Sequence, residues 1–215
     1  MATDFLAKIP NNLRVSCDIY EYLGYQDVLD RRLYLSGVIS YDNDAFSDPD
    51  VMSPEDIVQY ILQFNREDKE LKPEERKPIR LYINSPGGDI EQGFPIVSAI
   101  QLSRTPVYTI NVGEWASMAF LIGITGHRRF SLPYMQFLMH DGSNFILGST
   151  GKVQDQADFN KRFEKEVVKR HVLSHSKISE KEYDKRFREE WYMLPEDALE
   201  KGFIDHVVTS LDEIL

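Results

Sequence analysis

Two consecutive segments of the chain share one pattern: a short apolar strand, a sharp turn and an apolar helix. The first segment predicts a strand at 79–83 and a glycine-containing turn at 84–88, followed by apolar residues at helical spacing. The second predicts a strand at 106–112 before an apolar stretch at 115–124. Tandem units of this kind are typical of a parallel sheet with helical crossovers, whose sites lie at the carboxyl ends of the strands. The pattern therefore predicts an α/β fold in which the two turns lie side by side.

Other segments predict further elements around these two units. A chain of 215 residues can bury one sizeable core, so we expect a single domain over residues 1–215. Ser53 and Pro54 supply an N-cap and a first helical residue, which predicts a helix that begins there. The remaining expected elements are strands at 32–39, 128–132, 135–140 and 203–208, a long charged helix at 152–174, a helix at 195–202 and an exposed charged connection at 66–77.

Composition disfavours several classes of function. The chain has 25 basic and 35 acidic side chains, a net charge of −10, which opposes attraction to nucleic acid and to anionic membranes. The longest apolar stretch is far shorter than the ~20 residues of a transmembrane helix, and the amino terminus does not resemble a secretory signal. The single cysteine, Cys17, cannot form an intrachain disulfide and is expected to be a buried thiol. We therefore expect a cytoplasmic protein.

Neither a metal nor a cofactor is expected. No glycine-rich phosphate-binding motif of the P-loop type occurs, so any ATP hydrolysis has to come from a partner. The histidines make no cluster with cysteine and no short zinc-ligand motif; they are His127, His140, His171, His175 and His206.

A serine and a histidine lie at the ends of two predicted strands, those at 106–112 and 135–140. Ser117 lies in the second turn, and His140 ends a later apolar strand. A serine hydroxyl is a poor nucleophile unless a base takes its proton and an oxyanion site stabilises the tetrahedral intermediate. Each residue alone is more often structural, but together they indicate nucleophilic catalysis, because Gly87 and Gly88 offer backbone amides close to the same edge.

Four ordered motifs resemble ClpP, the proteolytic subunit of the ATP-dependent Clp proteases. The resemblance covers about residues 32–208 and needs an insertion between Tyr41 and Pro78. It implies a ClpP/crotonase-like fold with a protruding strand-helix handle at about 141–190. The motifs are Leu81-Tyr-Ile-Asn-Ser-Pro-Gly-Gly88, Gly113-x-x-Ala-Ser117-Met118-Ala, the strand end Met139-His140, and Ala198-x-x-x-Gly202-x-Ile-Asp205.

The resemblance also implies roles for individual residues. Ser117 matches the family's nucleophile and His140 its general base, while the backbone amides of Gly88 and Met118 match its oxyanion hole. An extended peptide would be held by strand addition between two backbone strips. The residues that match these strips are Ile90, Asn144, Phe145 and Ile146, with Leu147 ending the second strip.

The third member of the triad departs from the family pattern. Glu190 stands where the family has its aspartate, and Glu189 replaces the arginine that usually precedes it. Glutamate orients histidine in serine hydrolases of other folds, although its extra methylene requires a more distant backbone. Asp141 follows His140 where the family has glutamine, so Asp141 is an alternative acid. Asp184, the nearest aspartate upstream, is expected on a solvated helix face.

The resemblance implies a serine endopeptidase subunit that hydrolyses unfolded polypeptides inside a barrel of two stacked heptameric rings, a tetradecamer. The rings would be a homo-oligomer or would include a paralogue, and an ATP-dependent Clp unfoldase would deliver the substrate. The region before Arg32 lacks the family's amino-terminal loop, which contacts the unfoldase. The alternative is a non-catalytic or weakly active structural subunit of a mixed ring. A hydratase or isomerase of the crotonase type is disfavoured, because that chemistry needs no serine and histidine pair.

Overall fold

The computed structural model describes residues 24, 26–40, 52–143 and 146–215. The chain divides into two compact units, Met1–Arg32 and Leu33–Leu215. Within the first unit, the Arg32 guanidinium pairs with the Asp27 carboxylate at 3.3 Å. Among the described residues, no helix combines the length and the apolar content that crossing a membrane requires. All described candidate site residues belong to the second unit.

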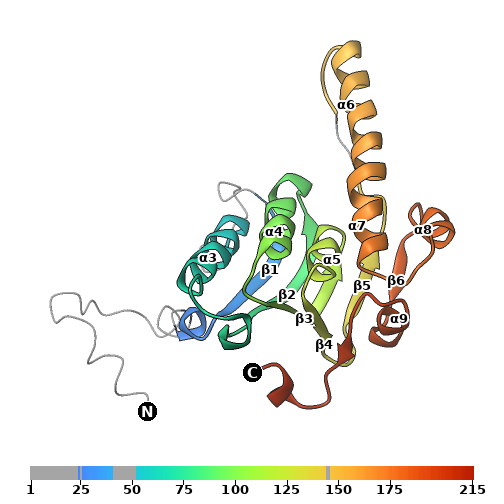
Figure 1. Cartoon of the computed structure of the whole chain (residues 1–215). Helices are drawn as coiled ribbons and strands as arrows, with labels where there is room; N and C mark the ends of the chain where they lie inside the picture. The colour runs from blue at the N-terminus through green and yellow to red at the C-terminus, as the bar shows by residue number, and fades with distance from the viewer. Residues whose placement is uncertain (1–23, 25, 41–51, 144–145) are drawn as a thin grey trace. The chain divides into compact units, whose positions relative to one another are not determined.

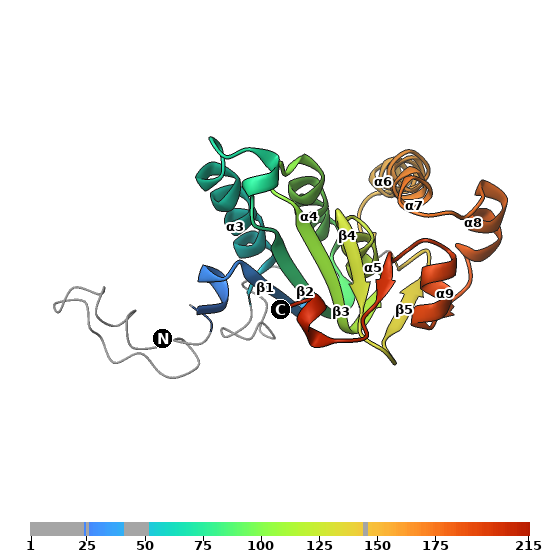
Figure 2. The ribbon, with the colours of Figure 1, turned by 60° about the horizontal axis from the view of Figure 1, so that its bottom comes forward.

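In the described part of the chain, seven strands form one mostly parallel sheet (Figures 1 and 2). The path is β1-β2-β3-β4-β7, and β5 pairs with both β3 and β6. The pairs β2/β3, β3/β4, β3/β5 and β4/β7 are parallel, whereas β5/β6 is antiparallel. These pairings confirm the predicted α/β fold. The strands are β1 (Arg32–Ile39), β2 (Ile79–Gly88), β3 (Val107–Ala116), β4 (Arg128–Ser131), β5 (Gln136–Met139), β6 (Trp191–Met193) and β7 (His206–Val207).

Helices α3 (Pro54–Glu67), α4 (Ile90–Leu102) and α5 (Met118–Gly123) cover one face of the sheet (Figures 1 and 2). The predicted start of α3 is confirmed, because the Ser53 hydroxyl accepts the Asp56 N–H at 3.1 Å and the Asp56 carboxylate accepts the Ser53 N–H. The charged segment beyond α3 is mostly exposed, as expected, and contains a 3-10 helix at Pro73–Glu75.

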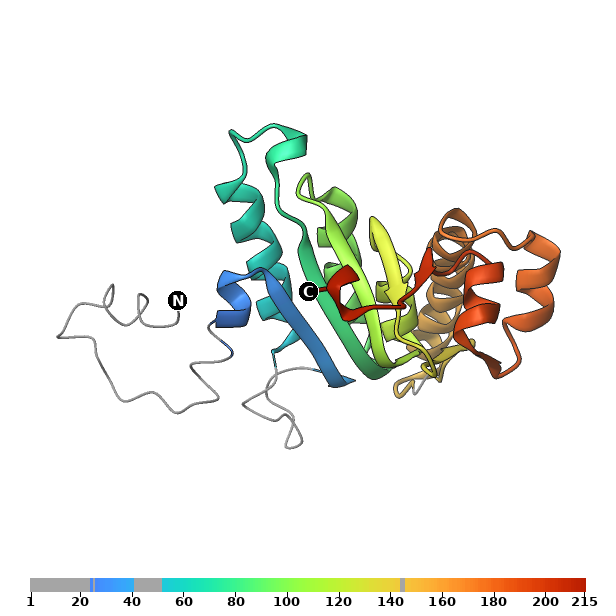
Figure 3. The same cartoon turned by 90° about the horizontal axis from the view of Figure 1, so that it is seen from below.

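The opposite face of the sheet is covered near β2 to β4 by the C-terminal 3-10 helix, Leu211–Glu213 (Figure 3). Its neighbour Ile214 is buried against Tyr82, Ile110 and Phe130 of three successive strands. The Tyr82 hydroxyl donates a hydrogen bond to the Ile214 carbonyl. Alternate residues of β2 therefore fill two separate cores, one on each face of the sheet.

Strands β2 and β3 both run further than the sequence pattern predicts. The pairing shifts between Ile83/Asn111 and Ser85/Trp115, so β3 carries two extra residues there. The Asn84 carboxamide oxygen accepts the Glu114 N–H at 3.1 Å within this bulge. Because a side chain replaces the lost ladder bond, the strands continue to Gly88 and Ala116, and α5 begins three residues later than the apolar stretch suggests.

A long charged helix follows the sheet, as predicted, and extends beyond it (Figure 1). It consists of α6 (Thr150–Phe163), a π-helical segment (Glu164–Val168) and α7 (Lys169–Ser174). No side chain of α6 is buried. The following helices are α8 (Glu180–Arg186) and α9 (Pro195–Glu200). The π-helical segment separates the exposed α6 from α7, in which His171 and Val172 are buried.

His171 of α7 is buried, with 6% of its surface exposed. Burial in this apolar environment lowers the pKa of its imidazole from 6.5 to about 4, although a hydrogen bond to the Leu121 carbonyl opposes the change. The unfolded chain therefore binds a proton at this histidine between about pH 6.5 and pH 4, when the folded chain does not.

We expect the free energy of unfolding to fall as the pH is lowered from about 6.5 to about 4. The His171 contribution is complete above pH 6.5, and the difference in pKa corresponds to a loss of about 3 kcal/mol at the acid end. Urea unfolding at a series of pH values measures this slope, and His171→Gln should reduce it. An equal slope in wild type and variant would contradict the assignment.

Candidate active site

Ser117 has an unusual backbone conformation between β3 and α5. Its φ is 53° and its ψ is −121°, a sparsely populated region for a residue with a side chain. The Ser117 N–H donates to the Leu138 carbonyl at 3.0 Å, and its carbonyl accepts the Phe120 N–H at 3.1 Å. Both backbone groups are therefore fixed, and the half-buried Ser117 side chain makes no capping hydrogen bond to α5.

The glycine turn at the end of β2 packs directly on the serine turn. A Cβ atom on Gly87 would lie 2.6 Å from the Ala116 carbonyl oxygen, 2.7 Å from the Ser117 Cβ and 2.8 Å from the Met118 nitrogen. The φ of Gly87 is 92° and that of Gly88 is 145°, conformations that favour glycine. The expectation that the two turns lie side by side is confirmed.

The contacts of Gly87 differ from those of Gly88. The Gly87 N–H donates to the Ser85 hydroxyl at 3.1 Å, and that hydroxyl donates to the Gly37 carbonyl at 2.6 Å. A Cβ atom on Gly88 would lie 2.2 Å from the Ile39 carbonyl oxygen. The Gly87 amide is thus used to hold the turn in place, which leaves Gly88 as the oxyanion candidate.

Met118 is the first residue of α5, so its N–H is among those that the helix leaves without an intrahelical acceptor. Its side chain is 1% exposed and packs against Gly93 of α4. A Cβ atom added to Gly93 would lie 2.2 Å from the Met118 Cγ. The packing of α4 on α5 therefore fixes the position of the Met118 amide.

His140 and Glu190 meet through strand pairing. His140 follows β5, whose Leu138 pairs with Ala116 of β3, so the histidine leaves the sheet beside the serine turn. Met139 pairs with Trp191 in the antiparallel β5/β6 ladder, which brings the next residues, His140 and Glu190, opposite each other. The His140 Nδ1 lies 3.1 Å from the Glu190 Oε1.

The free nitrogen of His140 is the one that a nucleophile would use. Nε2 is buried and has no hydrogen-bond partner among the described residues. Within the same residues, no hydrogen bond joins this nitrogen to the Ser117 hydroxyl. Catalytic hydrogen bonds are often loose before substrate binds, so an unpaired Nε2 beside a serine turn is compatible with a base at rest.

Comparison with known proteins identifies the family of this chain. The sequence model of the Clp protease family matches residues 51–211. The chain belongs to the Clp protease family. It is 33% identical over 167 residues to the ATP-dependent Clp protease proteolytic subunit 1 of Streptomyces avermitilis, which covers 77% of this chain and 74% of the relative.

Two further relatives support the same family assignment. The ATP-dependent Clp protease proteolytic subunit 3 of Streptomyces coelicolor is 30% identical over 191 residues, covering 88% of this chain and 81% of the relative. The ATP-dependent Clp protease proteolytic subunit 2 of Thermobifida fusca is 33% identical over 163 residues, covering 74% of this chain and 75% of the relative. As a Clp protease family member, the chain is a serine-type endopeptidase.

The other predicted site residues of this Clp protease are less closely grouped. Asp141 is exposed, and in the described part of the chain no hydrogen bond joins it to His140. Ile90 begins α4 and is 44% exposed, while Ile146 is half-buried. Asn144 and Phe145 lie outside the described residues, and so does Cys17.

A lysine in the handle holds the segment that leads to Glu190. The Lys169 ammonium lies 2.6 Å from the Asp184 carboxylate and 2.8 Å from that of Glu180, so it ties α7 to α8. The hydrogen bond to Asp184 is the main reason that the pKa of Lys169 is raised. Asp184, expected to face solvent, therefore forms an ion pair while remaining 58% exposed. Arg186 adds a cation–π contact 5.5 Å above the Trp191 ring.

Two asparagines inside β2 and β3 hold the strands together, and sequence reasoning assigned them no role. Asn84 accepts the Glu114 N–H, and the Asn111 side chain donates to the Gln136 carbonyl at 3.0 Å. They hold β2, β3 and β5 together beneath the turns. A signal was present in the sequence, since each asparagine directly follows an isoleucine of an apolar segment, and a side-chain amide at such a position can replace a backbone partner.

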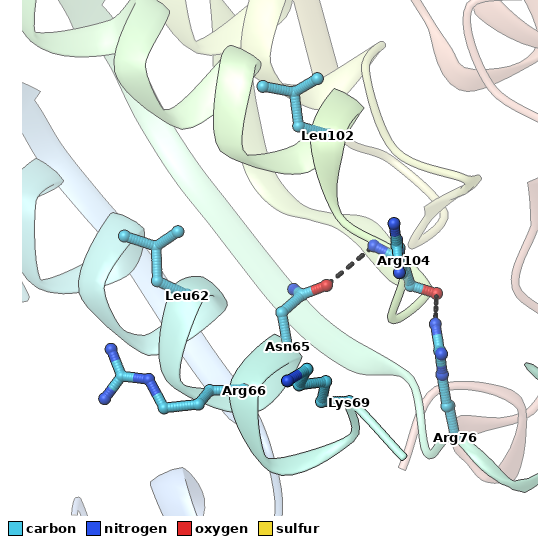
Figure 4. Close-up of a pocket in the computed structure, with 7 residues that line it drawn as sticks. All are labelled: Leu62, Asn65, Arg66, Lys69, Arg76, Leu102 and Arg104. Atoms are coloured by element: carbon cyan, nitrogen blue, oxygen red, sulfur yellow. Dashed lines mark hydrogen bonds between the residues drawn. The ribbon is translucent and has the colours of Figure 1, made fainter. Parts of the chain in front are cut away.

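A concavity lies between the C-terminal ends of α3 and α4 (Figure 4). Its volume is about 400 Å³, and the Arg104 N–H donates to the Asn65 carboxamide oxygen at 2.8 Å beside it. The residues that line it are Leu62, Asn65, Arg66, Lys69, Arg76, Leu102 and Arg104. This set includes no serine, histidine or carboxylate, so the pocket lies apart from the candidate active site. Among the described residues, no group of three or more histidine, cysteine, aspartate or glutamate side chains gathers as metal ligands would.

Proposed function

We propose that Ser117, His140 and Glu190 form a catalytic triad that hydrolyses unfolded polypeptides. The observation that carries the proposal is the 3.1 Å contact between His140 Nδ1 and Glu190 Oε1, beside a strained serine turn that packs on the glycine turn. Both carboxylates are exposed, but in the described part of the chain only Glu190 contacts the His140 ring, which favours Glu190 as the acid.

The chemistry is acyl transfer. His140 Nε2 takes the proton of the Ser117 hydroxyl as its oxygen attacks the peptide carbonyl, and the negative charge moves to the carbonyl oxygen. The amides of Gly88 and Met118 stabilise that oxyanion. His140 then gives its proton to the leaving amine, and a water molecule, activated by the same nitrogen, releases the acyl group. Glu190 keeps the Nδ1–H tautomer in place and stabilises the imidazolium.

The triad acid should be identified by paired substitutions. We expect Glu190→Gln to lower kcat/KM for a peptide substrate by about 10²- to 10⁴-fold, because the amide can no longer fix the tautomer or offset the imidazolium charge. Asp141→Asn, the matched control, should stay within about threefold of wild type. Steady-state kinetics on assembled protein measures both, and the reverse ranking of the two variants would make Asp141 the acid.

The assembly proposed for this chain is a barrel of two stacked heptameric rings, formed by one subunit type or with a paralogue. The exposed α6 supports it, because a long helix without buried side chains needs a partner to bury Phe159, which is 61% exposed. An ATP-dependent Clp unfoldase would supply substrate in the cytoplasm. Mass photometry should give about 350 kDa, fourteen copies of 25.0 kDa.

Cleavage of an unfolded polypeptide tests the proposed substrate class. Assembled wild-type protein should hydrolyse a fluorescently labelled, chemically unfolded polypeptide and leave the folded form of the same polypeptide intact. A correctly assembled protein that cleaves neither would favour the alternative, a structural subunit of a mixed ring.

A further inference from the structure

The imidazole of His171 joins the base of the handle to two helices of the active site. Its Nε2 lies 3.0 Å from the Leu121 carbonyl oxygen of α5 and 3.1 Å from the Thr125 hydroxyl just beyond that helix. Its Nδ1 lies 3.4 Å from the Gln101 side-chain nitrogen of α4. One buried side chain of α7 therefore contacts both α4 and α5.

These partners select one protonation state. A carbonyl can only accept a hydrogen bond, so Nε2 has to carry the hydrogen that Leu121 receives. The Gln101 amide nitrogen can only donate, so Nδ1 has to be unprotonated in this side-chain orientation. The His175 ring lies 4.3 Å away and the Phe94 ring 6.4 Å away, and no carboxylate among the described residues bonds to His171. The neutral imidazole thus satisfies every contact that the site offers.

The two helices that His171 contacts are the ones that begin at the oxyanion turns. Gly88 lies two residues before α4, and Met118 is the first residue of α5. Gln101 lies near the far end of α4, Leu121 lies in the second half of α5, and Thr125 lies two residues beyond it. A shift of either helix along its axis would therefore change the separation of the two amides.

We propose that His171 is a positioning residue of the peptidase site, which fixes α4 and α5 against the handle and so maintains the spacing of the Gly88 and Met118 amides. The role rests on the proposed function, because it matters only if those amides stabilise an oxyanion. Small displacements of such donors cost activity without preventing substrate from binding.

The test is steady-state peptide hydrolysis by assembled, full-length variants. His171→Leu removes the donor and should lower kcat at least tenfold, while KM stays within about twofold. His171→Gln keeps a side-chain N–H that can reach the Leu121 carbonyl and should recover at least a third of the wild-type kcat. The matched control is His175→Gln, which removes the neighbouring imidazole. Among the described residues, the His175 side chain has no hydrogen bond to α4 or α5, so this variant should keep kcat within twofold of wild type.

The outcomes separate this inference from the function it depends on. The proposed function would be overturned if assembled wild-type protein shows no peptide hydrolysis and a serine-directed fluorophosphonate does not label Ser117. If wild type is active and His171→Leu keeps the wild-type kcat, the positioning role alone is overturned. The same holds if His171→Leu raises KM and leaves kcat unchanged. If His171→Leu fails to assemble, Thr125→Val decides, since it removes a hydroxyl of the same network. A kcat loss of threefold or more supports the role, and an unchanged kcat overturns it.

Discussion

Replacing Ser117 with alanine is expected to lower kcat/KM for peptide hydrolysis by about four to six orders of magnitude. The loss is this large because the remaining residues cannot form the acyl-enzyme intermediate, and only oxyanion stabilisation and binding would persist. The fold should survive, since the Ser117 backbone carries the bonds to Leu138 and Phe120 that hold the turn. The measurement is kcat/KM on assembled protein, with thermal unfolding recorded on the same samples.

The matched control for this substitution is Ser98→Ala. Ser98 is an exposed serine of α4, and its hydroxyl forms none of the contacts that position the turns. Its replacement should leave kcat/KM within about twofold of wild type. Retention of more than a tenth of the activity by Ser117→Ala would show that another nucleophile carries the reaction.

Gly87→Ala should damage both stability and catalysis. The new methyl group would meet the Ala116 carbonyl, the Ser117 Cβ and the Met118 nitrogen at 2.6 to 2.8 Å, and the φ of 92° disfavours any side chain. We expect a loss of about 1–3 kcal/mol in the free energy of unfolding from strain and overpacking. We also expect kcat to fall by about 10²- to 10³-fold, as when one oxyanion donor is lost, because the two turns move apart.

Gly37→Ala separates the clash from the backbone strain. Gly37 also has a positive φ, 74°, but a Cβ atom there would meet nothing within 4 Å. The control should therefore lose stability of the order of 1 kcal/mol and keep its activity. Urea unfolding and peptide hydrolysis compare the two variants. Equal activity losses would mean that contact between the turns is not what matters at Gly87.

Local chemistry made part of this structure predictable. The N-cap at Ser53 and the tandem units that end in the glycine and serine turns depend on residues close together in the sequence. They were therefore visible as turn residues, caps and apolar spacing. Parallel pairing of β2 and β3 then brings Gly87 and Ser117 together without further information.

Other features depend on contacts between distant segments and could not be predicted in the same way. The meeting of His140 with Glu190 requires the antiparallel pairing of β5 with β6, which are separated by the whole handle. The family resemblance placed Glu190 at the position of the triad acid but left Asp141 open as the alternative. The bulge opposite Asn84 and the burial of His171 likewise depend on which surfaces pack together. A polar residue at helical spacing gives no sign of what it will contact.

The most direct test of the account is covalent labelling of the assembled protein with a serine-directed fluorophosphonate, followed by mass spectrometry of the labelled peptide. Wild type should carry one adduct on Ser117, and both Ser117→Ala and His140→Ala should lose it while their assembly persists. Absence of the adduct from correctly assembled wild type, or labelling that persists in His140→Ala at the wild-type rate, would contradict the claim that histidine activates this serine.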